Sequence, residues 1–167
     1  IEPEIKGLIS GIDSYDFKEL RIQQDEGEPL NLILLEPVIP SPRLIIAGAG
    51  HIGRALSLIG SMLDFEVTII DDRPEFANDE NIPSANNIIR GDIGDSIQKI
   101  EKGDDAYFVI VTRGHRDDGK ALKACIGSGA AYIGMIGSKT KVALMHKEFI
   151  GNGWATEDQW ERVFAPI

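Results

Sequence analysis

One stretch decides the fold: Leu44-Ile45-Ile46-Ala47-Gly48-Ala49-Gly50-His51-Ile52-Gly53-Arg54-Ala55. A short apolar run leads directly into three glycines with the spacing G-x-G-x-x-G. A helical apolar pattern follows, with one stripe formed by Ile52, Ala55, Leu56, Ile59 and Leu63. A strand, a glycine turn and a helix in this order are typical of a phosphate-binding turn for dinucleotides.

Each glycine of this turn has a distinct expected role. Gly48 allows the tight turn, Gly50 lets the backbone approach a pyrophosphate, and Gly53 lets the helix pack close to the strand. Free backbone N–H groups at the helix start, including that of Ile52, then face the anion. The alternative is a glycine-rich turn that binds nothing.

Downstream of Arg43, strands and helices alternate regularly. We expect strands at about 43–47, 66–71, 87–90, 106–112 and 131–136. We expect helices at about 51–63, 93–102, 117–126 and 139–150, and a short final helix opened by a capping box of Thr156 and Gln159. This alternation predicts an α/β fold with a doubly wound, mostly parallel, Rossmann-like sheet and a small N-terminal appendage.

Three prolines, Pro37, Pro40 and Pro42, mark a stiff linker and a domain boundary. Residues 1–40 are then the tail of an N-terminal domain plus the Pro-rich linker, and residues 41–167 form a nucleotide-binding domain. In the first part we expect a buried strand at Leu30–Leu35, preceded by a short helix or loop and a further strand. The chain starts with Ile and stops at Ile167, so we expect an excerpt of a longer polypeptide.

Composition excludes several classes of protein. A formal net charge of −10 over 167 residues argues against nucleic-acid binding, which needs clustered Lys and Arg. An anionic small molecule remains allowed, because a helix N-terminus attracts it locally. The single cysteine, Cys125, excludes an internal disulfide framework. With no signal-peptide pattern and no apolar run of about 18 residues, we expect a cytoplasmic protein that does not enter a membrane.

Three further stretches should meet the glycine turn, because ligands bind at the C-terminal ends of parallel strands. The first is Asp71-Asp72-Arg73. Asp71 lies 18 residues after Gly53, close to the usual acidic position that accepts the ribose hydroxyls. An acid there points to NAD, whereas Arg73 keeps NADP open. The alternative is a solvated carboxylate at the end of a strand.

The second stretch is Thr112-Arg113-Gly114-His115-Arg116-Asp117-Asp118. Thr112 and Arg113 supply hydrogen-bond donors, and His115 is the candidate acid or base near neutral pH. Asp117 and Asp118 supply either such groups or ordinary charge at a helix N-terminus. We expect no metal, because His51 and His146 do not complete a site with His115.

The third stretch is Gly134-Met135-Ile136-Gly137-Ser138-Lys139-Thr140-Lys141. Gly137, Ser138 and Lys139 open a helix and could hold a second anionic group. The alternative is a serine cap with surface lysines. Cys125 is interpreted as a small buried apolar residue rather than a reactive thiol.

Four motifs in order resemble the C-terminal domain of the xanthine dehydrogenase accessory proteins of the XdhC/CoxI type. They are Gly48-Ala49-Gly50-His51-Ile52-Gly53, Thr112-Arg113-Gly114-His115, Tyr132-Ile133-Gly134-Met135-Ile136-Gly137-Ser138-Lys139-Thr140-Lys141-Val142, and Phe164-Ala165-Pro166-Ile167. The similarity covers residues 30–167 and includes the Pro-rich approach. The chain departs from the pattern at Gly119, where the family has an apolar residue nearby, and it lacks most of the N-terminal domain.

The resemblance implies a maturation factor for molybdenum hydroxylases, one that binds a dinucleotide or the molybdenum cofactor and assists its sulfuration and insertion. It implies that His51 points toward the bound ligand. The implied partners are the apo-enzyme and a cysteine desulfurase, and a homodimer is left open. The cofactor is NAD, NADP or the molybdenum cofactor. The alternatives are an NAD(P)-dependent oxidoreductase, with His115 as acid or base, and a dinucleotide sensor.

Overall fold

The computed structural model describes residues 18–22, 31–35 and 40–167, and it divides the chain into two units. In the first unit, Ile1–Pro40, β1 (Lys18–Ile22) pairs with β2 (Asn31–Leu35) in an antiparallel ladder that sets Lys18 opposite Leu35. The predicted strand at 30–35 is therefore present as β2. The burial of that strand, and the helix or loop predicted before it, lie outside the residues whose placement is described.

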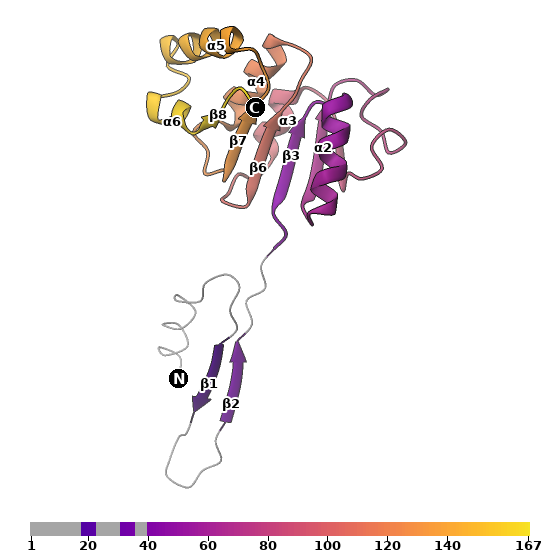
Figure 1. The fold of residues 1–167 in the computed structure, drawn as a ribbon, viewed down its shortest axis with the longest axis vertical. Coiled ribbons are helices and arrows are strands. Elements are labelled where there is room, and N and C mark those ends of the chain that lie inside the picture. The colour runs from indigo at the N-terminus through magenta and orange to yellow at the C-terminus, as the bar shows by residue number, and fades with distance from the viewer. Residues whose placement is uncertain (1–17, 23–30, 36–39) are drawn as a thin grey trace. The chain divides into compact units, whose positions relative to one another are not determined.

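The second unit, Ser41–Ile167, is built on one six-stranded parallel sheet (Figure 1). The strand order is β5-β4-β3-β6-β7-β8, and every pairing is parallel. The strands are β3 (Arg43–Ala47), β4 (Glu66–Asp71), β5 (Asn87–Arg90), β6 (Ala106–Ile110), β7 (Tyr132–Met135) and β8 (Val163–Phe164). The helices are α2 (His51–Met62), α3 (Ile93–Lys99), α4 (His115–Cys125), α5 (Lys139–Gly151) and α6 (Glu157–Glu161). The predicted doubly wound, Rossmann-like fold is confirmed.

Two apolar clusters lie on opposite faces of this sheet. On one face, Leu44, Ile46, Val67 and Ile69 pack with Ala77 and Ile82 from the β4–β5 connection, together with Leu56 of α2. On the other face, residues of α3, α4, α5 and α6 pack on the sheet around Phe108, Leu122 and Phe149. The chain moves from β3 outward to β4 and β5, then crosses to β6 on the other edge of β3. The crevice between the ends of β3 and β6 is therefore the place where the strand order reverses.

Helix α2 lies against the sheet through its small residues. Its buried positions are Gly53, Ser57 and Gly60, and a Cβ on Gly60 would lie 2.6 Å from a methyl carbon of Leu44. The large apolar residues of the predicted stripe point away: Ile52, Ile59 and Leu63 are exposed. The apolar stripe of an amphipathic helix normally faces the core. In α2 the small residues face the sheet instead, because the helix lies too close to the sheet for large side chains, and the large apolar residues face outward.

Several predicted boundaries were wrong by a few residues. The strand predicted at 106–112 ends at Ile110, and the helix predicted to start at 117 starts at His115, because Gly114 serves as its N-cap. The helix predicted to reach Lys102 ends at Lys99, since Ile100 already has extended backbone angles. The two-residue β8 was not predicted. The capping box of Thr156 and Gln159 is confirmed.

The close packing of α2 gives a direct stability test. A Cβ on Gly53 would overlap the carbonyl oxygen of Gly48, whereas a Cβ on Gly50 would meet nothing within 4 Å. Gly53→Ala should therefore lower the free energy of unfolding by at least about 2 kcal/mol. Gly50→Ala, the matched control, should change it by less than about 1 kcal/mol. Urea unfolding of both variants measures the contrast, and equal losses would contradict this packing.

Candidate functional site

The glycine turn between β3 and α2 has two positions that the chain itself requires to be glycine. Gly48 has a φ of +116°, and a Cβ there would lie 2.5 Å from the carbonyl oxygen of Val111. Gly53 has no room for a Cβ beside Gly48. The expected tight turn at Gly48 and the expected close packing at Gly53 are thus both seen, and they fix the start of α2 at the end of β3.

Gly50 is different, because nothing in the described part of the chain requires it to lack a side chain. Its φ of −74° suits any residue, and a Cβ would enter open space. Gly50 is also the N-cap of α2 and makes no side-chain cap, so the first N–H groups of the helix, at His51, Ile52 and Gly53, lack intrahelical acceptors. A side chain at Gly50 would fill the space in front of these donors. An anion there would meet unpaired N–H groups and the positive end of the helix.

Asp71, predicted to accept the ribose hydroxyls, is buried and already holds four donors. Its Oδ2 accepts hydrogen bonds from the Ala49 N–H and from Nη2 of Arg73, each at 2.8 Å. Its Oδ1 accepts from Nε of Arg73 at 2.8 Å and from the Arg73 N–H at 3.0 Å. A ribose hydroxyl would have to displace one of these donors. The bond from Ala49 ties the end of β4 to the glycine turn.

The surroundings of Asp71 hold it in the charged form. Burial would by itself raise the pKa of this carboxyl, but hydrogen bonds from the Arg73 side chain, the Ala49 N–H and the Arg73 N–H outweigh burial and bring the pKa below its ordinary value of 3.8. The Arg73 side chain is held by these bonds to Asp71, and its guanidinium also lies over the Phe76 ring, 4.0 Å from the centroid. Neither side chain of this pair is free to meet a ligand without rearrangement.

Asp72 and Arg113 are two exposed members of the predicted set that lie against each other. Nη2 of Arg113 donates to Oδ2 of Asp72 at 3.2 Å. Asp72 follows β4 and Arg113 follows β6, and these strands lie on either side of β3. The pair therefore connects the two loops that flank the glycine turn. A cavity of about 260 Å³ lies beside it, lined by both residues together with Asp92, Ile93, Arg116, Asp117 and Lys120.

The loop after β6 is held by a buried carboxylate that the sequence did not single out as a positioning residue. Asp118, in the first turn of α4, is fully buried; it accepts the Thr112 hydroxyl at 2.6 Å and forms an ion pair with Lys141 of α5. Burial lowers the pKa of Lys141 below its ordinary value. Thr112 is thus a structural partner of Asp118 in this arrangement. The acidic first turn of α4 was the available sequence signal.

Helix α4 begins in the same way as α2. Its N-cap, Gly114, makes no side-chain cap, and a Cβ there would meet nothing within 4 Å. The two helices follow β3 and β6, the neighbouring strands at the crevice. Both begin with the dipeptide Gly-His, at Gly50-His51 and Gly114-His115.

His115, the candidate acid or base, is turned toward α5. Its Nε2 lies 3.5 Å from Oε2 of Glu148, and the two residues line a groove of about 400 Å³ with Phe149 and Trp154. Residues of the glycine turn do not line that groove. His51 is exposed at the first position of α2.

The loop after β7 lies one strand further from the glycine turn, because β6 separates β7 from β3. The Ser138 hydroxyl accepts a hydrogen bond from the Lys141 N–H at 3.2 Å, so Ser138 is the N-cap of α5. Gly137 lies against the Lys141 side chain, and Lys139 is exposed. Lys141 of α5 forms an ion pair with Asp118 of α4. The loop after β7 is therefore tied to the loop after β6 and not to the glycine turn.

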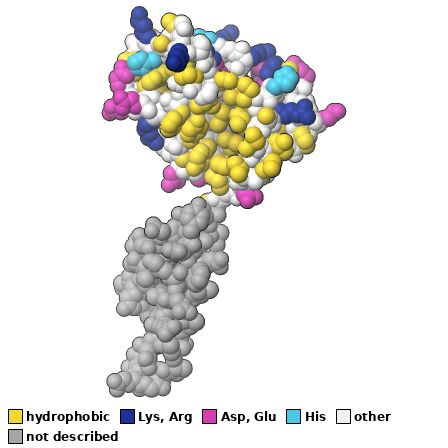
Figure 2. Space-filling model, in the orientation of Figure 1, with side chains coloured by type: hydrophobic (Ala, Val, Ile, Leu, Met, Phe, Trp, Pro, Cys, Tyr) yellow, Lys and Arg dark blue, Asp and Glu magenta, His cyan; other side chains and the backbone are white. Residues whose placement is uncertain are grey.

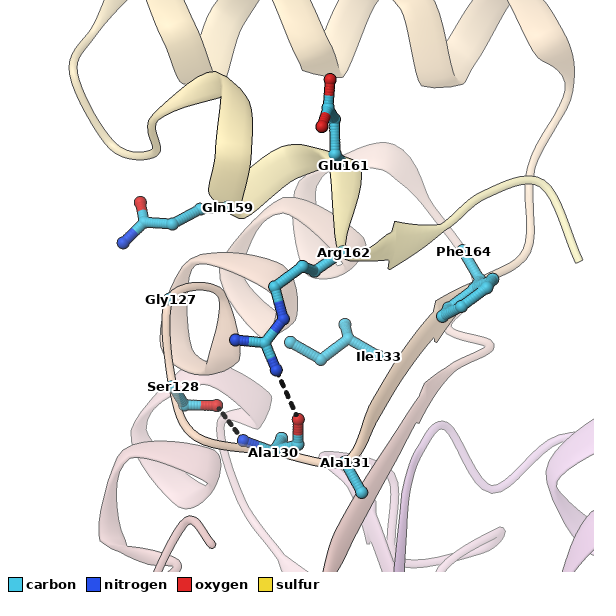
Figure 3. Close-up of a pocket in the computed structure, with 9 residues that line it drawn as sticks. All are labelled: Gly127, Ser128, Ala130, Ala131, Ile133, Gln159, Glu161, Arg162 and Phe164. Atoms are coloured by element: carbon cyan, nitrogen blue, oxygen red, sulfur yellow. Dashed lines mark hydrogen bonds between the residues drawn. The ribbon is translucent and has the colours of Figure 1, made fainter. Parts of the chain in front are cut away.

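A cavity of about 500 Å³ lies where the chain enters β7 and β8 (Figure 3). The Arg162 side chain extends into it and donates from Nη2 to the Ala130 carbonyl at 3.3 Å, with Ser128, Ile133 and Phe164 around it. Its size exceeds that of the cavity beside Asp72. It lies at the amino-terminal ends of the strands, whereas ligands of open parallel sheets bind at the carboxyl ends. The glycine turn therefore remains the candidate site.

Cys125 is fully buried, and burial raises the pKa of its thiol to about 12. Its interpretation as a small core residue is confirmed. Within residues 40–167 and the two short strands before them, no helix is long and apolar enough to cross a membrane.

The sheet, the reversal of strand order and the glycine turn together define a Rossmann-like domain. Residues 44–167 match the XdhC Rossmann domain family, and the chain belongs to that family.

Two similar proteins are considerably longer than this chain. It is 28% identical over 127 residues to YqeB, an uncharacterised protein of Escherichia coli K12, covering 75% of this chain and 23% of YqeB. It also resembles a solved Bacillus halodurans protein described as a xanthine dehydrogenase, with 27% identity and a TM-score of 0.60, covering 74% of this chain and 38% of that one. The chain therefore spans less than half the length of either relative.

The bonds around Asp71 predict a pH-dependent contribution to stability. Asp71→Asn should lower the free energy of unfolding by about 2–4 kcal/mol at neutral pH, because Arg73 loses its buried charged partner. The pKa of Asp71 in the folded protein lies below its unfolded value of about 3.9. The stability that ionised Asp71 contributes is therefore fully present at pH values above the unfolded pKa, and it is lost as the pH falls through the folded pKa. The difference in free energy of unfolding between the wild type and Asp71→Asn, measured by urea unfolding, should therefore shrink as the pH falls below about 5.

Asp72→Asn is the matched control, since Asp72 is adjacent and half exposed. It should cost less than about 1 kcal/mol at neutral pH. If the loss in free energy of unfolding caused by Asp71→Asn stayed constant into strong acid, the hydrogen bonds from Ala49 and Arg73 would not be what keeps Asp71 ionised.

Proposed function

We propose that this chain is the nucleotide-binding part of an accessory factor for xanthine dehydrogenase-type enzymes. Its ligand is a pyrophosphate-containing dinucleotide, either NAD, NADP or the dinucleotide form of the molybdenum cofactor. The pyrophosphate lies at the N-terminus of α2, in the crevice between β3 and β6. The factor assists sulfuration and insertion of the molybdenum cofactor into the apo-enzyme.

The open space at Gly50 is the observation that carries this proposal. Gly48 and Gly53 are explained by the packing of the protein itself, but Gly50 is not. A bound phosphate that needs close approach of the backbone gives the missing reason for a glycine. The uncapped first turn of α2 supplies donors at the same point.

In this proposal, the choice between NAD and NADP depends on the exposed residues Asp72 and Arg113 rather than on Asp71 and Arg73, which the sequence predicted for this role. Asp71 and Arg73 bind each other, so neither offers a free group for the ribose or its 2′-phosphate. Asp72 is the next acid along the crevice, and Arg113 is the cation closest to it. A ribose hydroxyl would compete for Asp72, whereas a 2′-phosphate would compete for Arg113.

The orientation of His115 favours the accessory role over the runner-up, an oxidoreductase. An acid or base for hydride transfer must reach the reacting group at the cofactor. The His115 ring instead lines a groove toward Glu148 that the glycine turn does not share.

Membership of the XdhC family supports the partner part of the proposal. The resemblance of the solved relative, described as a xanthine dehydrogenase, agrees with it. A cysteine desulfurase as sulfur donor, and a cytoplasmic location, remain predictions of the same role.

Calorimetric titration tests the proposal with the full chain and four titrants: NAD, NADP, the dinucleotide form of the molybdenum cofactor under anaerobic conditions, and apo-xanthine dehydrogenase. We expect saturable heat with at least one dinucleotide and with the apo-enzyme. Gly50→Ala should weaken dinucleotide binding at least about tenfold, because its methyl group occupies the space of the phosphate.

Gly129→Ala is the matched control, because a Cβ there also meets nothing and the residue precedes β7, at the amino-terminal end of the strands, whereas the glycine turn lies at their carboxyl ends. It should bind like the wild type. Absence of heat with every dinucleotide, in protein shown to be folded, would reject the nucleotide site. Hydride transfer to NAD from simple alcohols would instead favour the oxidoreductase.

A further inference from the structure

The groove between α4 and α5 is basic, in a chain whose formal net charge is −10. This α4–α5 groove encloses about 400 Å³, and its α4 side is formed by His115, Arg116, Gly119, Lys120 and Lys123. Among the described residues that line it, Glu148 is the one acid. Arg116, Lys120 and Lys123 follow one another at intervals of four and three residues, so they lie along one side of the helix. The proposed pyrophosphate site at the start of α2 does not account for this row of cations.

The groove is separate from the apolar surface of the domain. Figure 2 shows the face that carries α2, where hydrophobic side chains gather in one broad area and charged side chains lie around its margin. The helices α4 and α5 pack on the opposite face of the sheet. The row of cations therefore belongs to a surface of its own.

The chain neutralises this row only in part. Lys120 forms an ion pair with Asp92. In the part of the chain that the structure describes, no carboxylate pairs with Arg116 or Lys123, and Nζ of Lys123 lies instead over the Trp154 ring, 3.8 Å from the centroid. Two cations without an acidic partner favour an anionic occupant of the groove.

The floor of the groove is apolar. Phe149 is buried, and Trp154 packs edge-on against it with the ring centroids 5.5 Å apart. A carboxylate that pairs with a cation beside an apolar surface is partly shielded from water, so its attraction to the cation is stronger than on an open surface. The groove thus offers charge along its edge and an apolar contact below.

Gly119 leaves the helix backbone open at the middle of the groove. Glycine is, after proline, the least favourable residue inside a helix. The packing of α4 does not require it, because a Cβ on Gly119 would meet nothing within 4 Å. An occupant that lies close against the helix gives a reason for the missing side chain.

The row matches an acidic segment of a protein in length. The rise from Arg116 to Lys120 is about 6 Å, and that from Arg116 to Lys123 is about 10 Å. Carboxylates at alternate positions of an extended segment are about 6.5–7 Å apart, so about four residues span the row. A small molecule would be poorly enclosed, because His115, Arg116 and Lys123 are exposed to solvent.

The groove adjoins the crevice at the ends of β3 and β6. Arg116 and Lys120, which line the groove, also line the cavity beside Asp72 and Arg113. A protein held in the groove therefore lies next to the crevice in which the proposed dinucleotide binds.

We infer that the α4–α5 groove is the docking site for an acidic segment of the partner enzyme. The inference rests on the proposed function for the identity of that partner, a xanthine dehydrogenase-type apo-enzyme. Carboxylates of the segment pair with Arg116 and Lys123, an apolar side chain between them contacts Trp154, and the segment passes over Gly119. Docking in this position presents the apo-enzyme to the crevice.

Calorimetric titration of the full 167-residue chain with apo-xanthine dehydrogenase tests the inference. Arg116→Glu and Lys123→Glu should each raise the dissociation constant at least about tenfold, because each sets a carboxylate against the acidic segment. Binding of the wild type should weaken as salt is raised. Lys123→Glu should leave the affinity for the dinucleotide unchanged, since Lys123 does not line the cavity at the crevice.

Gly119→Leu separates docking from folding. Leucine favours a helix over glycine and enters open space, so this variant should unfold at the same or a higher urea concentration than the wild type. It should nevertheless weaken binding of the apo-enzyme at least about tenfold, because the leucine fills the path of the segment.

Lys99→Glu is the matched control, because it makes the same change of charge at an exposed lysine of α3 that lines neither the groove nor the crevice cavity. It should bind the apo-enzyme like the wild type. If the wild type binds and the three groove variants bind equally well, or if Lys99→Glu weakens binding as much as they do, the docking site is overturned while the proposed partner stands. A wild type that does not bind the apo-enzyme rejects the proposed partner and this docking site together.

Discussion

The contact between Gly53 and the carbonyl of Gly48 is the constraint on which the rest of the structure depends. It brings α2 so close to β3 that no Cβ fits between them. Small residues must then continue along the inner face of the helix, and Ser57 and Gly60 do so. The large apolar residues of α2 are left outside. The same contact thus places the helix N-terminus at the crevice and creates the apolar surface on the far side of the helix.

A second set of bonds holds the crevice in shape. Asp71 joins the end of β4 to the glycine turn through the Ala49 N–H, and Asp118 joins the end of β6 to α5 through Lys141. Both carboxylates are buried and paired, which makes removal of one partner costly. What remains available to a ligand is the backbone at the start of α2 and the exposed pair of Asp72 and Arg113. Under the proposed function, the backbone at the start of α2 would recognise a phosphate, and the side chains of Asp72 and Arg113 would determine which nucleotide fits.

The sequence predicts the layout of this molecule well because each strand is followed by glycine or helix signals at short range. The roles of Gly48 and Gly53 are also readable from their spacing. The bonding of Asp71 could not be predicted from the sequence. The spacing that marks a ribose acceptor does not reveal that the Arg73 side chain, two residues later, binds the Asp71 carboxylate. The exposure of Ile59 and Leu63 is equally hidden, since an apolar stripe does not tell which face of the helix meets the sheet. Lys141 lies in a stretch that the sequence singled out, but its partner Asp118 is set by the packing of α5 on α4.

The proposed function requires that an anion binds at the N-terminus of α2. Backbone amide NMR of the ¹⁵N-labelled chain, titrated with inorganic pyrophosphate, tests it without assuming which dinucleotide is the ligand. We predict that the largest and saturable shifts fall on the amides of His51, Ile52 and Gly53, with smaller shifts at Gly114 and His115. Shifts confined to the cavity around Arg162, or saturation with no change at His51, Ile52 and Gly53, would contradict it.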